Sequence, residues 1–213
     1  MTLRFLLPVA IVIGLASVAG VAQEPQPDQT QEQEPVYVFG TTVVIPSGLK
    51  GVIYFISHSA KNLTELEKEK PRGTIYASSL NIPEQDYKLG FPGITNRLEW
   101  FAIDYSGKFW INKPGEYRWE LTADDGAMLY IDDNLVIDNG GLHPAVTLRG
   151  TTQLSGGIHN IRVPYFQGLK YRVALVLKVA PPGEKFRVFS TEEFKPPADP
   201  ETWAFPDAAG KVK

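Results

Sequence analysis

A cluster of acidic residues in the middle of the chain has the chemistry to hold a cation or the hydroxyl groups of a sugar. Asp124 and Asp125 are adjacent and are followed by Gly126. Carboxylates are preferred Ca²⁺ ligands, and the ion takes about 6 to 8 oxygens. Three more aspartates follow within a short stretch, at Asp132, Asp133 and Asp138. We interpret the first two as turn residues, whereas Asp138 opens a Gly-rich loop that could face Asp124.

Short strands must position these carboxylates. Tyr117, Trp119 and Leu121 alternate with charged residues, which is the period of a strand with one buried face. This strand is expected to stop at the paired aspartates. Asp133-Asn134 tolerates positive φ and predicts a tight two-residue hairpin turn between the next two strands. Neighbouring side chains on a regular strand point to opposite faces, so the pair can meet one cation only where the backbone departs from a strand.

A longer pattern surrounds the pair: GKFWINKPGEYRWELTADDGAMLYIDDNLVIDNGG, then a Gly-rich turn and IHNIRVPYF. With G-x-Y before the strand, DDG after it and LYID at the hairpin, it resembles the PA14 domain family of adhesins, glycosidases and bacterial surface proteins. The match covers about Trp100 to Val179 well and Gly48 to Tyr54 more weakly. The resemblance implies an all-β fold, an antiparallel PA14-like β-sandwich or barrel, to which the sequence adds one short helix.

The same resemblance implies a metal site. In the sugar-binding fungal adhesins of this family, the matching aspartates are joined by a cis peptide, and both bind a Ca²⁺ ion that holds sugar hydroxyls. Asp124 and Asp125 are therefore the expected metal ligands, with Ca²⁺ as the expected cofactor. The alternative is that Asp125-Gly126 forms a simple turn while Asp124 caps local amides.

Two loops are expected to complete a ligand-binding rim. In lectin-like members more ligands come from a loop carrying Asn, whereas here that loop, Gln167 to Lys170, has only the amide of Gln167. Trp110 is expected to offer a stacking face, because its neighbours Phe109 and Ile111 take the opposite side of their strand. For His143 a hydrogen-bonded role is favoured over a metal-ligand role, since no metal-binding His spacing is present. The expected rim residues are Asp124, Asp125, Asp138, Asn139, His143, Gln167 and Trp110.

The ends of the chain differ in composition from its middle. Residues 1–22 combine Arg4, an apolar run and a small-residue end, which is typical of a secretory signal peptide, with an uncleaved anchor as the alternative. Residues 23–35 have no apolar side chain and predict a disordered spacer. We expect the β domain at 36–190 and a Pro-rich tail at 191–213. Aromatic residues after Pro181 predict that the first half of the C-terminal stretch docks on the domain.

Further elements are expected inside the domain. A capping-box pattern predicts the short helix at about 62–70. A long loop is expected from Asn81 to Asn96. Strands rich in β-branched and aromatic residues are expected at Val36–Ile45, Gly51–Ile56 and Thr74–Ser79.

Composition excludes several classes of function. A formal net charge of -3 gives no electrostatic footprint for nucleic acid, and the lack of Cys excludes disulfides and thiolate metal sites. No G-x-S-x-G, Walker or G-x-G-x-x-G motif is present, so we do not expect an enzyme. The leading hypothesis is a secreted or periplasmic, cell-envelope module that binds a glycan or polysaccharide. The alternative is an envelope protein–protein interaction or structural module without sugar binding, with membrane contact only through an uncleaved N-terminal segment.

Overall fold

The computed structural model describes residues 48–198 apart from 61, 62, 64, 65, 67, 68, 95, 96 and 170. The expected signal peptide, spacer and first strand, most of the expected helix and the end of the tail lie outside these residues. The helical element that lies wholly within the described residues is a single 3-10 turn, η2 (Tyr87–Leu89). None of the described helical segments is long and apolar enough to cross a membrane.

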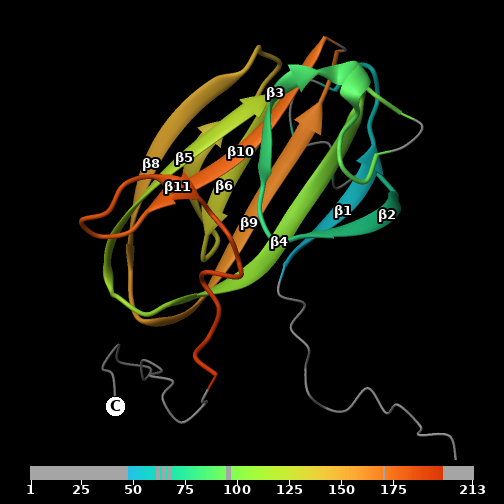
Figure 1. Ribbon diagram of the computed structural model, residues 1–213. Helices are drawn as coiled ribbons and strands as arrows, with labels where there is room; N and C mark the ends of the chain where they lie inside the picture. The colour runs from blue at the N-terminus through green and yellow to red at the C-terminus, as the bar shows by residue number, and fades with distance from the viewer. Residues whose placement is uncertain are drawn as a thin grey trace, which may run out of the picture. The chain divides into compact units, whose positions relative to one another are not determined.

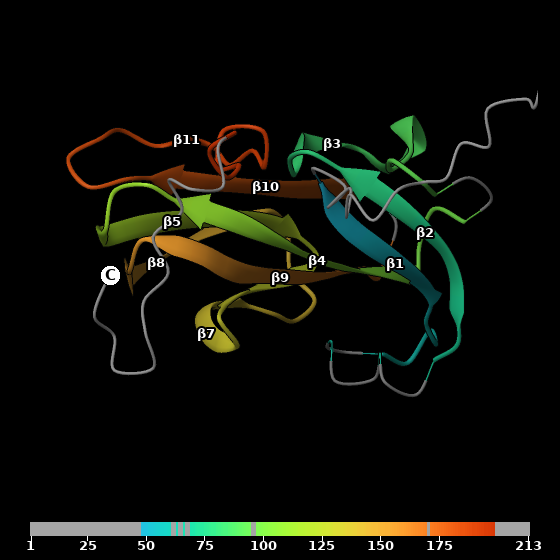
Figure 2. The same cartoon turned by 90° about the horizontal axis from the view of Figure 1, so that it is seen from below.

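Two antiparallel sheets pack face to face, as Figures 1 and 2 show. The first has six strands in the order β2-β1-β4-β9-β6-β7. Its members are β1 (Leu49–Phe55), β2 (Pro71–Ala77), β4 (Phe101–Ile111), β6 (Gly126–Ile131), β7 (Asn134–Asn139) and β9 (Gly157–Gln167). The longest ladder joins β4 to β9, from Phe101 opposite Gln167 to Ile111 opposite Gly157. The all-β antiparallel prediction is confirmed.

The second sheet has the order β11-β10-β5-β8, with β3 also paired to β10. Its members are β3 (Asn81–Asp86), β5 (Gly115–Asp124), β8 (Val146–Leu154), β10 (Arg172–Ala180) and β11 (Arg187–Val188). The prediction of one long loop from Asn81 to Asn96 was wrong in its first part, which is β3. Pro83 did not prevent pairing, because the register shifts between Val173 and Leu175, opposite it.

The core lies between the sheets and includes the first half of the C-terminal stretch. Phe189 is fully buried, with its ring edge-on to Phe109 at a centroid distance of 5.6 Å. Phe194 is also buried, and the Thr191 N–H donates to the Ser78 carbonyl oxygen at 2.9 Å. The prediction that this stretch docks is confirmed for residues 181–198.

The hairpin between β6 and β7 turns one residue earlier than predicted. Asp132 and Asp133 take the positive φ values, 47° and 63°, whereas Asn134 already pairs with Ile131. Side-chain bonds fix this position: Asp132 accepts the Asn160 N–H at 2.8 Å and lies 2.6 Å from Nδ1 of His159. Both carboxylates are therefore turn residues, as expected.

Candidate functional site

The paired aspartates lie where the chain crosses from the second sheet to the first. Asp124 is the last residue of β5 and pairs with Ala174, and β6 begins at Gly126. The peptide bond between Asp124 and Asp125 is cis, as the resemblance implies. Both residues are buried, with only 6% and 7% of their surfaces exposed.

Asp125 connects two loops through its carboxylate. One oxygen accepts the His143 N–H at 3.2 Å, and the other accepts the Gly168 N–H at 2.7 Å. Asp124 has a backbone bond from Ala145. These contacts bring the loop after β7 and the loop after β9 to the same carboxylate pair.

The pair carries negative charge that is poorly compensated. Burial raises the pKa of Asp124 to about 6, and the neighbouring charges of Asp125 and Glu84 act in the same direction. Burial also raises the pKa of Asp125, against the opposing effect of the Gly168 and His143 amides. The charge of His143 lowers the pKa of both aspartates but does not cancel the effect of burial. None of the ion pairs among the described residues includes either aspartate. A cation at this position would restore the balance.

Contrary to the sequence prediction, Gln167 does not present its amide to the rim. It is the last residue of β9 and is fully buried. Its Oε1 lies 2.6 Å from the Tyr165 hydroxyl, and its Nε2 donates to the carbonyl oxygens of Leu169 and Arg172 at 2.9 and 3.0 Å. The amide therefore closes its own loop instead of presenting a free ligand oxygen, because buried polar groups must find partners.

The loop after β7 contributes residues with distinct roles. Asn139 is buried, and its Nδ2 donates to the carbonyl oxygens of Leu121 and Val146, which fixes the base of the loop. Asp138 is exposed and accepts the Gly140 N–H at 3.1 Å. That Asp138 faces Asp124 stays a prediction. His143 is brought to the pair, through its main chain.

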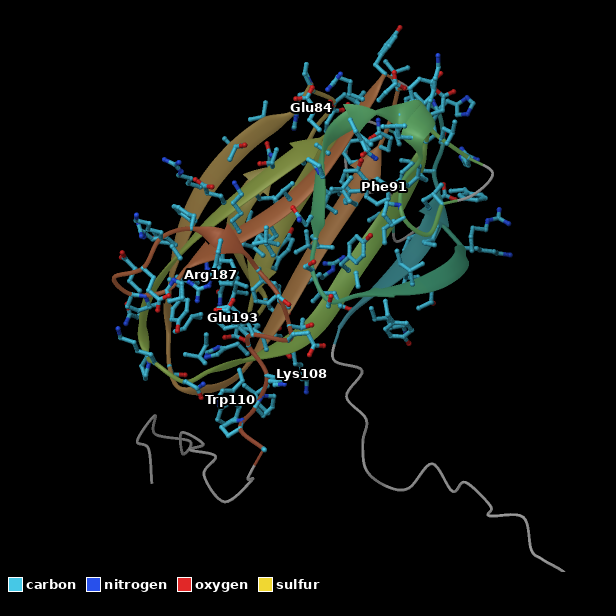
Figure 3. All side chains as sticks on the ribbon, viewed as in Figure 1. Glu84, Phe91, Lys108, Trp110, Arg187 and Glu193 are labelled. Atoms are coloured by element: carbon cyan, nitrogen blue, oxygen red, sulfur yellow. The ribbon has the colours of Figure 1, made fainter. Side chains whose placement is uncertain are left out.

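Trp110 does not provide the predicted stacking face. The residue is only 4% exposed. Its neighbours Phe109 and Ile111 are buried as well, so both faces of β4 are covered here. Its main-chain N–H donates to the Phe194 carbonyl oxygen at 2.7 Å, and Figure 3 shows Trp110 where the C-terminal segment passes β4. The sequence prediction was wrong because the Trp110 side chain is buried, and the docked segment bonds to the main chain of β4 at this residue.

The rim also contains residues that the sequence analysis did not predict. A Cβ on Gly168 would lie 2.4 Å from Cδ2 of Leu142 and 3.2 Å from Oδ2 of Asp125, so a side chain here would displace Leu142 and crowd the carboxylate. Leu142, Leu169 and Tyr171 are large exposed side chains on the two loops that meet at the pair, 42%, 55% and 74% exposed. The only sequence signal for them was a single apolar or aromatic residue among turn-forming and charged neighbours.

Two acidic side chains are the donors that come together at this position. The described residues contain no group of three or more His, Asp or Glu side chains arranged around one point. Asp124 and Asp125 supply adjacent, buried carboxylate oxygens that form no ion pair among the described residues. Because Ca²⁺ takes about 6 to 8 oxygens, the remaining positions would belong to water, main-chain carbonyls or the hydroxyls of a ligand.

Comparisons with known proteins agree with the fold. A family model described as PA14 domain matches residues 47–190. A PA14 domain of an antifreeze protein has a TM-score of 0.57 and 17% identity, over 68% of this chain and 88% of that one. A PA14 sugar-binding domain from an RTX adhesin has a TM-score of 0.53 and 18% identity, over 68% and 96%.

A third solved structure, an anti-sigma factor domain-containing protein, has a TM-score of 0.56 and 18% identity and covers 72% of this chain. This chain spans about half of that protein, 49%. No curated protein matches the sequence. At these identities the structural likeness shows the fold.

Proposed function

Because the chain belongs to the PA14 family, we propose that it is a glycan-binding module whose ligand meets the rim around Asp124 and Asp125. One observation carries the proposal: two adjacent, buried carboxylates form no ion pair among the described residues, and burial raises the pKa of both although the charge of nearby His143 opposes this. Burying charge without a partner is unfavourable, and a cation with sugar hydroxyls would compensate it. A relative described as a sugar-binding domain of an adhesin supports this class of ligand.

Each residue of the rim has a role in this proposal. Ca²⁺, when bound, would link the carboxylates to neighbouring hydroxyl groups of a sugar. Asp124 offers the more open oxygens, because those of Asp125 already accept the N–H groups of His143 and Gly168. These two bonds orient Asp125 and hold the loops on either side of the ligand. The apolar surface of Leu142 is available to the C–H face of a sugar ring.

The proposed module binds without catalysis and acts outside the cytoplasm. The N-terminal sequence supports export, and the enzyme motifs sought in the chain are missing from its sequence. Its place is therefore the periplasm, the cell envelope or the exterior. A module of this kind would attach its bearer to a polysaccharide.

The test is a glycan array probed with the full chain in millimolar Ca²⁺. We expect binding to at least one glycan, lost in the double variant Asp124→Asn and Asp125→Asn. Asp138→Asn is the matched control, since Asp138 is exposed and only caps its own turn, and it should bind normally. Binding to no glycan, together with specific capture of an envelope protein by the wild type, would favour the protein-interaction role instead.

A further inference from the structure

A groove lies away from the carboxylate pair, against the edge strand β2. Its volume is about 510 Å³, and it is bounded by β2, the segment Ser79–Ile82, the turn at Pro92-Gly93 and Tyr105 of β4. Small-molecule sites commonly have volumes of about 300 to 1,000 Å³. β2 is at the outer edge of its sheet, which leaves this side open (Figure 2). None of the residues around Asp124 and Asp125 lines this groove.

Tyr105 gives the groove a polar group without a partner. The residue is 1% exposed, and its hydroxyl is in none of the tyrosine hydrogen bonds found among the described residues. Burial alone raises the pKa of this tyrosine. In contrast, the similarly buried Tyr165 hydroxyl lies 2.7 Å from the Asp124 carbonyl oxygen, and the Tyr117 hydroxyl donates to Lys113. Buried tyrosine hydroxyls normally find a partner, so this one requires an explanation.

Tyr105 is one of the residues that line the groove. No side-chain oxygen or nitrogen in the described part is both sealed from solvent and without a hydrogen bond. The Tyr105 oxygen must therefore keep a small exposed area, and the groove is the open space that Tyr105 lines. The ring reaches this position because Gly51 lies over it, where a Cβ would be 2.8 Å from Cε1 of Tyr105.

The walls of the groove are held by the surrounding fold. Ser79 pairs with Ser190, and the Leu80 carbonyl oxygen accepts the Leu177 N–H at 3.0 Å. On the other side Gly93 has φ +82°, and a Cβ there would lie 2.4 Å from Cγ2 of Ile75, so the turn packs directly on β2. The groove is therefore shaped before a ligand arrives.

The lining favours a neutral ligand with both polar and apolar faces. None of the described lining residues is Asp, Glu, Lys, Arg or His, so a charged ligand would lose its hydration without gaining a counter-charge. Hydroxyl and amide groups come from Thr74, Ser79 and Asn81, beside the apolar side chain of Ile82. Tyr76 is 59% exposed and offers its ring at the groove.

We propose that this groove is a second, metal-independent site for a neutral saccharide, with the Tyr105 hydroxyl bonded to the sugar and the Tyr76 ring against its C–H face. A pyranose has the hydroxyl edge and the apolar face that the lining can satisfy together. The site is independent of the carboxylate pair. A protein carrying both sites would hold a polysaccharide at two points, which raises avidity where the geometry allows both to engage.

The experiment is an array of neutral oligosaccharides probed with the full chain in EDTA, which removes any contribution from a metal at the carboxylate pair. We expect binding to at least one saccharide, equal in the double variant Asp124→Asn and Asp125→Asn. Tyr105→Phe should weaken this binding by about fivefold or more, because only the hydroxyl is removed. Tyr76→Ala should weaken it as well.

A matched control separates binding from folding. Tyr117→Phe also removes one hydroxyl, but that group donates to the Lys113 carbonyl oxygen at 2.9 Å. We expect Tyr117→Phe to lower the melting temperature and keep saccharide binding, and Tyr105→Phe to keep the melting temperature and weaken binding. No saccharide bound in EDTA, or equal binding by Tyr105→Phe, would overturn the proposal. Capture of an uncharged extended peptide in place of any saccharide would overturn the class of ligand.

Discussion

Replacing Asp124 by Asn should stabilise the metal-free protein at neutral pH. The side chain is 6% exposed, and burial raises its pKa from 3.8 to about 6. The folded state therefore binds the proton more tightly than the unfolded state, and ionisation weakens the fold. Each pKa unit corresponds to about 1.4 kcal/mol, so the charged carboxylate lowers the free energy of unfolding by roughly 3 kcal/mol at most.

The sign of this effect determines its pH dependence. Below a pH of about 3.8 Asp124 is protonated in both states, and the effect is absent. Stability falls as the pH rises from about 3.8 to about 6 and stays lowered above that range. Asn keeps an oxygen to accept the Ala145 N–H but cannot ionise. The gain from Asp124→Asn should therefore be present at pH 7.5 and small at pH 4.

The assay is thermal and urea unfolding in EDTA at both pH values. We expect a gain of roughly 2 to 3 kcal/mol at pH 7.5, or about 5 to 10 °C in melting temperature. Asp133→Asn is the control: this exposed turn residue has φ 63°, which Asn tolerates, and the change should stay within about 0.5 kcal/mol. A variant no more stable than the wild type at pH 7.5, or equally stabilised at both pH values, would refute the reasoning.

Two further predictions concern the fold that carries the rim, and urea unfolding tests both. Phe189→Ala should lower the free energy of unfolding by about 3 to 5 kcal/mol, since the ring is fully buried. Phe186→Ala, at a partly exposed neighbour, is the control. An equal loss of stability in the two variants would mean that the segment does not belong to the core. Gly150→Ala should destabilise by about 1 to 3 kcal/mol, because the added Cβ would lie 2.5 Å from the Val136 carbonyl oxygen. Gly156→Ala, whose nearest contact is 3.7 Å, should have little effect, and equal losses in the two variants would contradict the packing argument.

The sequence predicted the strands well because their side chains alternate. Tyr117, Trp119 and Leu121 lie on one face of β5, and all are buried as expected. The paired aspartates were placed correctly at the end of this strand, since a change from alternation to acidic and glycine residues marks where a strand stops. Local chemistry was thus sufficient for these elements.

The remaining differences come from contacts between distant parts of the chain. Trp110 is buried, and its main chain bonds to Phe194, more than eighty positions later, which alternation within β4 cannot reveal. Gln167 resembles a loop residue in the sequence, yet its amide is bonded to Tyr165 and to the far end of its own loop. β3 contains Pro83, which argues against a strand until the irregular register of β10 is known.

Isothermal titration calorimetry of a glycan into the full chain tests the central claim most directly, using the strongest binder from the array in Ca²⁺. We predict that the wild type binds this glycan in Ca²⁺ with an affinity that is at least tenfold weaker in EDTA and is weakened to the same degree by the double variant Asp124→Asn and Asp125→Asn. Equal affinity in Ca²⁺ and EDTA, with the double variant binding as the wild type does, would contradict the assignment of the ligand to the carboxylate pair.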